Sequence, residues 1–265
     1  MDKITELEKQ IKTWENFNKN GELNEKITKA KEELENLKNG EVEEEINKDL
    51  LLCSHKDLLQ GASNKQYNSY SYGIQLGFVD KERTNGEMNK YLYRNDIESR
   101  REELLADGIQ VPSMRTLERD FKFLSQLGYV NIINTKSKGL CYIIQQSVDG
   151  KNYISISYNR WKKLITWTNK NMLRLYVVFE IKCNCNNYVM LTREYLCKCM
   201  GINPTEGNKK FIGTMVQGLE RLGAIIIDRK HETIKIQDEN GNTKYKNVTH
   251  NYYRLTTEKE FEDKK

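Results

Sequence analysis

The chain has 265 residues, with 43 basic and 38 acidic side chains and a formal net charge of +5. This length suits two domains of roughly 100 residues each plus an extension. No segment approaches the roughly 20 uncharged apolar residues of a membrane span, and the start Met1-Asp-Lys-Ile-Thr-Glu6 lacks the apolar stretch of a signal peptide. We therefore expect a cytoplasmic protein that does not bind membranes.

The charge is unevenly distributed along the chain. Residues 1–49 hold 9 lysines and 14 acidic residues, a net charge of −5, so the rest of the chain carries +10. Such a split is typical of a protein in which one part associates with protein and another contacts a polyanion.

Six cysteines raise the question of disulfides or metal. A Lys-rich chain without a signal peptide favours a reducing compartment and free thiols. The pairs Cys183-Asn-Cys185 and Cys197-Lys-Cys199 could hold zinc, but structural zinc sites usually have CxxC spacing. The preferred interpretation is that Cys197 fills a small core position on a helix and the others are loop or surface thiols. We expect no metal and no cofactor.

Apolar residues recur three and four apart from Ile4 to Leu37, which predicts amphipathic helices over residues 1–49. The turn sequence Asn18-Lys-Asn-Gly21 breaks the register, giving a helical hairpin or a short interrupted coiled coil. This extension either associates with a partner or packs onto the body. The acidic run 41–45 predicts a solvated linker.

Residues 60–90 are rich in Asn, Ser, Gly and Tyr and predict at most one strand, near Tyr70–Val79. Tyrosines this dense could stack on nucleic-acid bases if they faced solvent, although packing in a core is favoured. They are Tyr67, Tyr70, Tyr72, Tyr91 and Tyr93.

The segment 95–145 has the cap and turn residues expected of two helices and a hairpin. A helix over 95–106 ends near Gly108, and Ser113 caps the next helix, 113–127. That helix has an apolar stripe at positions 114, 117, 121, 124 and 127. Strands follow at 129–133 and 140–144. The opposite helix face and the hairpin tip carry Arg115, Thr116, Arg119 and Lys122, then Lys136 and Lys138.

A loose copy of residues 123–133 returns 95 residues later as 218–228 and predicts a second unit. The alternating segment 153–158, a helix over 161–167 and a helix over 172–181 that is apolar nearly all round precede a short strand at 189–191. Thr192 caps a helix through Met200. The helix 208–222 then places Lys209, Lys210, Thr214 and Gln217 outward.

Strands at 224–228 and 233–237 predict a second hairpin, with Arg229, Lys230 and His231 at its basic tip. A further hairpin through 238–242 leads to a last strand near Tyr252–Leu255.

In both units a helix with a basic outer face ends at a glycine and leads into a hairpin, which is the layout of a winged helix-turn-helix. We therefore predict an α+β chain with winged-helix domains at 50–149 and 150–257. A helical extension, 1–49, precedes them, and a charged tail, 258–265, follows.

This layout suits the reading of double-stranded DNA. Arg115 and Arg119 lie one helical turn apart, so both can reach guanine edges in one major groove, while Ser113 and Thr116 can reach phosphates or a thymine methyl. Basic wing residues would contact the backbone. The alternative is that these cations only solvate an outer face, and the second unit could instead pair two subunits. The predicted contacts in the second unit are Lys209, Lys210, Thr214, Gln217, Arg229 and Lys230.

Enzymatic activity is not expected. The sequence has no Gly-x-x-x-x-Gly-Lys-Ser/Thr run for phosphate binding, and its histidines at 55, 231 and 250 lack metal-ligand spacing. Paired histidines beside a catalytic tyrosine, which a nicking replication enzyme would need, are missing.

The span Pro112-Ser-Met-Arg-Thr-Leu-Glu-Arg119 and the close Leu127-Gly-Tyr-Val130 resemble winged-helix DNA-binding domains, and the tandem resembles plasmid and phage replication initiators. The likeness covers roughly residues 90–256. It implies binding to repeated origin sites, homodimers in exchange with monomers, and host partners such as a helicase or its loader. The helical first 49 residues depart from that pattern. A transcriptional regulator and a protein-interaction scaffold are the alternatives.

Overall fold

A computed structural model describes residues 9, 11–14, 24–38, 49–79, 89–136, 138–147, 150–166, 172–237 and 243–263. The chain divides into two compact units, Met1–Lys48 and Asp49–Lys265. Predictions for Ile4, Phe17 and Trp167, for the acidic run 41–45 and for residues 238–242 lie outside the described residues.

The first unit contains helical residues 11–14 and helix α2 (Asn24–Lys38). Ile11, Ile27 and Ala30 are buried together, and Trp14 and Leu34 pack against them. The two helical segments therefore share one small apolar cluster.

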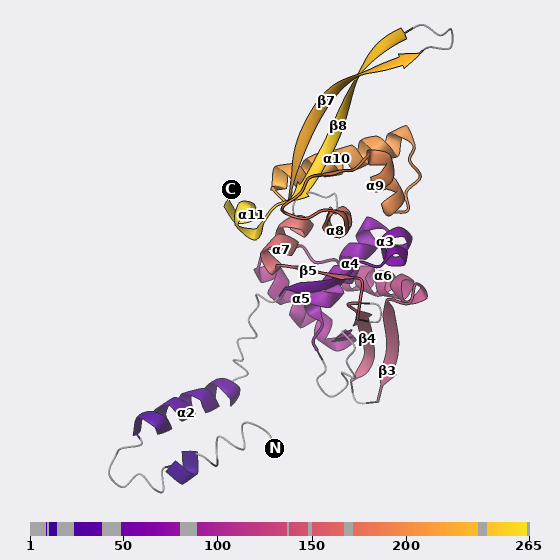
Figure 1. The fold of residues 1–265 in the computed structure, drawn as a ribbon. Helices are drawn as coiled ribbons and strands as arrows, with labels where there is room; N and C mark the ends of the chain where they lie inside the picture. The colour runs from indigo at the N-terminus through magenta and orange to yellow at the C-terminus, as the bar shows by residue number, and fades with distance from the viewer. Residues whose placement is uncertain are drawn as a thin grey trace. The chain divides into compact units, whose positions relative to one another are not determined.

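The second unit is a mixed α+β fold in which one series of elements occurs twice. Each copy runs strand, helix, helix, strand, helix, helix, strand, strand (Figure 1). The first repeat comprises β1 (Leu50–Cys53), α3 (Lys56–Gly61), α4 (Asn64–Leu76), β2 (Asn89–Tyr93), α5 (Ile97–Ala106), α6 (Met114–Gln126), β3 (Val130–Thr135) and β4 (Gly139–Gln145). The second comprises β5 (Tyr153–Ile156), α7 (Tyr158–Thr166), α8 (Leu173–Lys182), β6 (Val189–Met190), α9 (Arg193–Cys199), α10 (Glu206–Leu222), β7 (Ile225–Gln237) and β8 (Thr243–Leu255).

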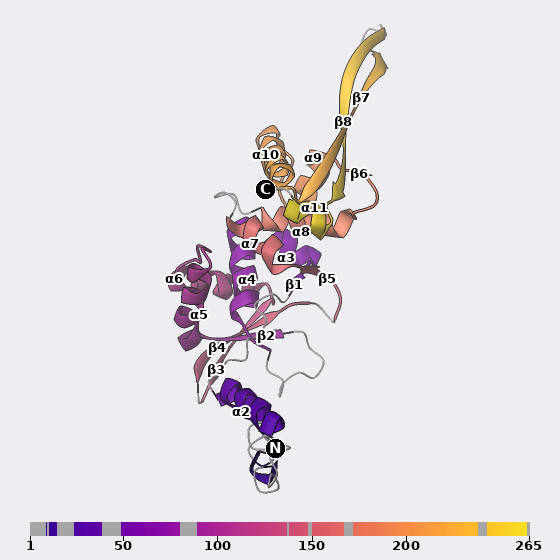
Figure 2. The ribbon, with the colours of Figure 1, turned by 90° about the vertical axis from the view of Figure 1, so that its left-hand side faces the viewer.

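The sheets of the two repeats have the same topology. The first is ordered β2-β4-β3 and the second β6-β8-β7, and all of their pairings are antiparallel. The hairpins β3–β4 and β7–β8 project from opposite ends of the unit (Figures 1 and 2). The internal similarity seen in the sequence therefore extends over the whole repeat.

The first strands of the two repeats pair with each other. In this antiparallel ribbon Leu50 lies opposite Ile156 and Cys53 lies opposite Tyr153. Because Leu50 and Tyr153 begin corresponding strands, exchanging the repeats maps the ribbon onto itself. A local two-fold axis therefore passes through the β1–β5 pair.

Further contacts join the equivalent pairs of helices, α3 with α9 and α7 with α5. Gln60, at the end of α3, donates from Nε2 to the Lys198 carbonyl in α9, 2.9 Å away. Between the corresponding helices of the other pair, Tyr158, at the start of α7, donates from Oη to Asp107 beyond α5, at 2.7 Å. The residues of the two predicted domains thus contribute to one continuous core, which extends from Leu50 to Phe261.

Two buried polar contacts cross this core. Trp161 Nε1 in α7 donates to Ser71 Oγ in α4 over 3.1 Å. The buried Arg174 side chain in α8 donates to Asn64 Oδ1, at the start of α4, and to the Met200 carbonyl. Burial lowers the pKa of Arg174 to about 10, so the group remains charged at neutral pH.

The predicted strand at Tyr70–Val79 is wrong, because α4 occupies that segment as a buried helix. Ser63 and Gln66 form a capping box at its start, and the tyrosines face inward. Tyr67 Oη donates to the Cys53 carbonyl at 2.8 Å, and Tyr70 Oη donates to the Gln145 carbonyl at 2.6 Å. The preferred core interpretation of these aromatic residues is confirmed.

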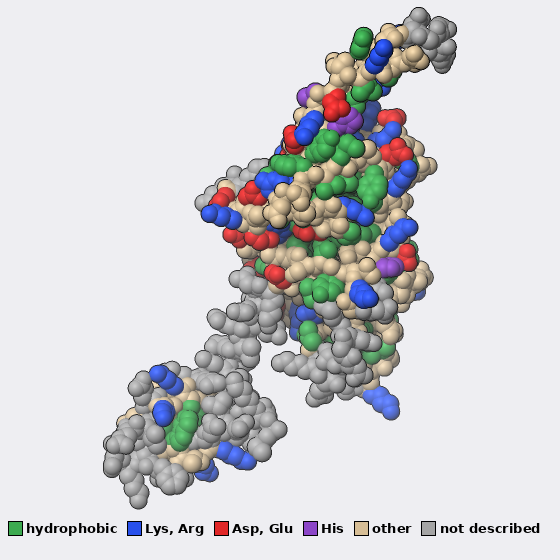
Figure 3. All heavy atoms as spheres, viewed as in Figure 1, with side chains coloured by type: hydrophobic (Ala, Val, Ile, Leu, Met, Phe, Trp, Pro, Cys, Tyr) green, Lys and Arg blue, Asp and Glu red, His purple; other side chains and the backbone are tan. Residues whose placement is uncertain are grey.

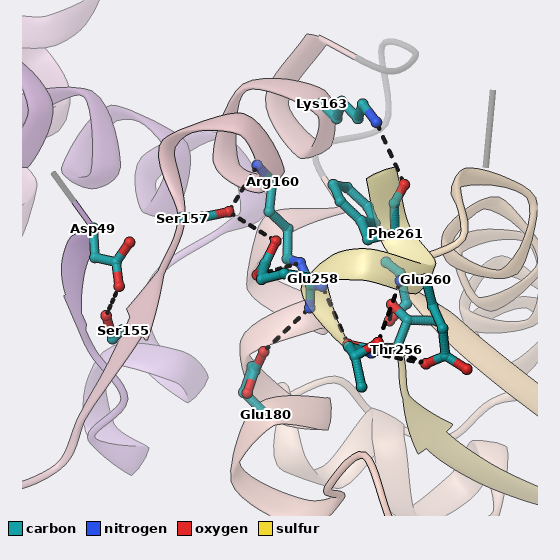
Figure 4. Close-up of polar contacts among 12 residues, drawn as sticks. Asp49, Ser155, Ser157, Arg160, Lys163, Glu180, Thr256, Glu258, Glu260 and Phe261 are labelled. Atoms are coloured by element: carbon teal, nitrogen blue, oxygen red, sulfur yellow. Dashed lines mark hydrogen bonds and ion pairs between the residues drawn. The ribbon is translucent and has the colours of Figure 1, made fainter. Parts of the chain in front are cut away.

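The predicted charged tail 258–265 also needs correction, because it contains helix α11 (Glu258–Asp263) with Phe261 fully buried. Figure 4 shows Arg160 of α7 at the centre of this contact. Its Nη2 donates to the Thr256 carbonyl at 3.1 Å, its Nε lies 3.1 Å from Glu258 Oε1, and its guanidinium carbon lies 4.5 Å from the Phe261 ring centroid. One apolar residue and one buried cation therefore fix the C-terminal segment.

A second ion pair holds the same helix. The Arg254 guanidinium and the Thr257 backbone N–H donate to Glu260 and lower the pKa of that carboxyl from 4.5 to about 2. This contribution to stability is complete above the ordinary pKa of glutamate and is lost as the pH falls toward 2.

All six cysteines are free thiols, as predicted, and Cys197 occupies the expected core position. Cys53, Cys141 and Cys183 are also buried, which corrects their assignment to loops or the surface. Burial raises the pKa of Cys53 and of Cys183 to about 11, so both thiols are protonated at neutral pH.

Gly201 lies at the contact between the repeats, so a substitution there tests this contact. It has φ +63°, and a Cβ added there would lie 2.5 Å from the Gln60 carbonyl oxygen. Gly108, in the corresponding place of the first repeat, has φ +77° with nothing within 4 Å of such a Cβ. Both alanine variants incur left-handed strain of about 1–2 kcal/mol, but Gly201→Ala also overpacks the junction. We expect it to lose at least about 1 kcal/mol more than Gly108→Ala in urea unfolding; equal losses would contradict the contact.

Candidate nucleic-acid interface

Helix α6 divides into the two faces that its sequence predicts. Leu117, Phe121 and Leu124 are fully buried, whereas Arg115, Arg119 and Lys122 are exposed. Ser113 is the N-cap and accepts from the Thr116 backbone N–H at 3.4 Å. The Ser113 and Thr116 hydroxyl oxygens also lie 3.0 Å apart, so both hydroxyls lie at the N-terminal end of the exposed face.

Arg119 is oriented by a buried carboxylate that sequence reasoning missed. Its Nε and Nη2 donate to Asp120 Oδ1 at 3.0 and 2.9 Å. Asp120 is 2% exposed and its Oδ2 accepts from Ser69 Oγ of α4 at 2.7 Å. The Arg119 side chain nevertheless remains 69% exposed. Position 120 lies on the apolar stripe of the helix, and this placement of an acid was the available sequence clue.

The predicted basic hairpin tip of the first repeat is present. Lys136 and Lys138 are exposed in the turn between β3 and β4. The Lys138 ammonium lies 4.9 Å from the Tyr93 ring centroid of the neighbouring strand β2. The hairpin tip therefore presents two cations, one of them packed on an aromatic ring.

Helix α10 also has the predicted faces, but it begins earlier, at Glu206 with Thr205 as N-cap. Its apolar residues Ile212, Met215, Val216, Leu219 and Leu222 are buried, and Lys210, Thr214 and Gln217 are exposed. Half-buried Lys209 forms an ion pair with Glu206, whose hydrogen bond raises the Lys209 pKa. The αL residue Gly223 (φ +80°) ends the helix, as expected of a C-terminal glycine.

The predicted tip at 229–231 is wrong. These residues lie within the continuous strand β7, which pairs with β8 from Ile225↔Leu255 to Gln237↔Thr243. Arg-Lys-His contains none of the residues that favour tight turns, whereas the later Asp-Glu-Asn-Gly-Asn does. Arg229 instead makes a bidentate pair with Glu220 of α10, at 2.8 and 2.6 Å, and the Lys230 ammonium lies 4.8 Å from the Tyr252 ring centroid.

A groove of about 530 Å³ lies between the start of α9, helix α10 and the base of the β7–β8 hairpin. Four basic side chains line the groove, and Glu194 is the single acidic one among its lining residues. The basic ones are Arg193, Lys209, Arg229 and His250. Gln217, Thr249 and Asn251 add hydrogen-bonding groups. The groove therefore presents basic and hydrogen-bonding groups, and Lys209, Arg229 and His250 also lie beside the carboxylates of Glu206, Glu220 and Glu232.

Arg193 is a second residue that sequence reasoning missed. Its guanidinium lies against the backbone of α10, where a Cβ on Gly213 would be 3.0 Å from Arg193 Cζ. Gly213 weakens a helix by propensity, by up to about 1 kcal/mol relative to alanine, but here it makes room for a cation at the groove. Only the tertiary packing reveals this role.

Comparison of the chain with family models, with curated proteins and with solved structures finds no match. Within the described residues, no group of three or more His, Cys, Asp or Glu side chains is placed to hold a metal ion. No helix in those ranges is long and apolar enough to cross a bilayer.

The link from Ser69 to Asp120 gives a quantitative test. Removing a hydrogen bond to a buried carboxylate is expected to cost about 1–3 kcal/mol, so Ser69→Ala and Asp120→Ala should each lower the free energy of unfolding. Because both changes remove one interaction, the double variant should lose less than the sum, with a coupling of about 1 kcal/mol or more. Urea unfolding of the four proteins measures it. Additive losses would show that the hydroxyl and carboxylate act independently.

Proposed function

We propose that the protein is a sequence-specific double-stranded DNA-binding protein with two winged helix-turn-helix modules, the recognition helices being α6 and α10. The observation that carries the proposal is the shared order helix, strand, helix, helix, strand, strand, with sheets ordered β2-β4-β3 and β6-β8-β7. In a winged helix the third helix of this series enters the major groove and the hairpin lies beside it.

The first repeat supplies base contacts in this proposal. Arg115 and Arg119 are exposed one turn apart on α6, and each can donate two hydrogen bonds to guanine O6 and N7. Asp120 limits the conformations of Arg119 before binding, which lowers the entropy lost on contact. Lys122, Lys136 and Lys138 supply charge for the phosphate backbone.

The second repeat contacts DNA through the groove beside α10. Lys210, Thr214 and Gln217 are exposed on that helix. Arg193, Lys209 and Arg229 line the groove between the helix and the hairpin. Lys209 pairs with Glu206 and Arg229 pairs with Glu220, so part of the positive charge of this repeat is already balanced by acidic partners.

We further propose that the DNA site is a replication origin of a plasmid or phage. The resemblance of the tandem to replication initiators supports this role. The local two-fold relation between the repeats suits inverted half-sites within each site. A homodimer and a host helicase or loader are the partners that this role implies. A transcriptional regulator would instead bind promoter palindromes, and a protein-interaction scaffold would select no DNA.

Selection of binding sites from random duplex DNA, followed by mapping onto the encoding replicon, tests the role. Clustered direct repeats beside the gene support an initiator. Arg115→Ala with Arg119→Ala should weaken binding to the selected site about 30-fold or more, since each base contact contributes about 1–3 kcal/mol. Lys56→Ala with Lys259→Ala, which removes two exposed cations from α3 and α11, is the matched control. Equal affinities for both variants would reject base reading by α6.

A further inference from the structure

The β7–β8 hairpin extends well past the body of the second repeat. Each of its strands has 13 residues, whereas β3 and β4 have 6 and 7. We call residues 229–237 and 243–251 the arm. Every arm residue of β7 is exposed, as are residues 243–247 of β8. Figures 1 and 2 both show the arm projecting away from the helices.

The arm is rich in positive charge. It carries Arg229, Lys230, Lys235, Lys244 and Lys246 but a single acidic residue, Glu232. Residues 238–242 add two acids by sequence, which leaves a net charge of +2 over 229–251. Figure 3 shows basic and hydrophobic side chains side by side along the arm.

The arm is held by pairing at its base and along its length. Arg229 is fixed to Glu220 of α10. Farther out, His231 Nδ1 and Thr249 Oγ1 lie 2.9 Å apart, and Thr233 Oγ1 donates to Asn247 Oδ1 at 2.8 Å. These cross-strand contacts join residues directly opposite each other in the register, so they stiffen the ribbon outside the core.

Near the end of the described strands, apolar and basic side chains lie opposite each other on one face of the ribbon. Ile234 lies opposite Lys246, and Ile236 lies opposite Lys244. Ile234 is 39%, Ile236 38% and Tyr245 73% exposed. A two-stranded ribbon is marginally stable alone in water, so this surface is suited to a partner that accepts both cations and apolar contacts.

We infer that the arm binds duplex DNA beyond the base pairs read by α10, with its lysines on the phosphates and its apolar residues toward the groove. This inference rests on the proposed function. A two-stranded ribbon fits a DNA groove, and its positive charge opposes pairing with the arm of a second copy. Nine residues span about 30 Å, so the arm extends the contact by most of one helical turn of about 34–36 Å.

The test uses the selected DNA site in a duplex that extends about two helical turns beyond it on each side. The variant Lys235→Gln, Lys244→Gln, Lys246→Gln removes three arm charges. The matched control Lys56→Gln, Lys182→Gln, Lys259→Gln removes three exposed charges from α3, α8 and α11. Affinity is measured from 50 to 200 mM salt, and hydroxyl-radical footprints are recorded for the wild-type protein and both variants.

Three phosphate contacts contribute about 2.7 to the slope of log affinity against log salt. Over this fourfold salt range, the wild type and control should therefore lose about 40-fold more affinity than the arm variant. The arm variant's footprint should also shorten at one end only.

Two results overturn the inference while leaving the proposed function intact. One is an arm variant with the wild-type slope and footprint. The other is an unchanged slope with a lower sedimentation mass, which would make the arm a subunit contact. If the wild type selects no site at all, the proposed function fails, and the arm inference fails with it.

Discussion

The pairing of β1 with β5 is the constraint on which the rest of the second unit depends. It joins the first strands of the two repeats around a local two-fold axis, and a single core then closes over both. Two helical domains on a flexible linker could adjust to sites of varied spacing. Here the separation of α6 and α10 is a property of the folded core, because buried contacts such as Trp161 to Ser71 connect the repeats directly.

Within this shared plan the repeats have diverged in chemistry. The first keeps a 13-residue helix with exposed arginines and a short hairpin. The second has a 17-residue helix whose Glu206 and Glu220 pair with Lys209 and Arg229, and a hairpin twice as long. The proposed division follows from these differences: base contacts are concentrated on α6, and phosphate contacts on the groove and hairpin of the second repeat.

Local sequence rules predicted the elements whose boundaries are set by local chemistry. Ser113 and Thr192 cap their helices as expected, and the apolar stripes of α6 and α10 are buried. Helix α4 was missed because its buried face includes Asn68, Ser69 and Ser71, which hydrophobic periodicity does not register. The capping box of Ser63 and Gln66 was the available clue. Asp120 and Arg193 act through residues far away in sequence, Ser69 and Gly213, so no local pattern could identify them.

The long hairpin illustrates why a local pattern can place a turn wrongly. Three basic residues between two apolar runs resemble a hairpin tip, yet strand pairing continues through them because their side chains alternate between two faces. Arg229 pairs with Glu220, while Lys230 packs on Tyr252. Pairing then extends to Gln237, far beyond any contact that buries apolar surface in the core. A ribbon that gains little from burial is held by its own cross-strand contacts, and its sequence is therefore free to carry charge suited to a polyanion.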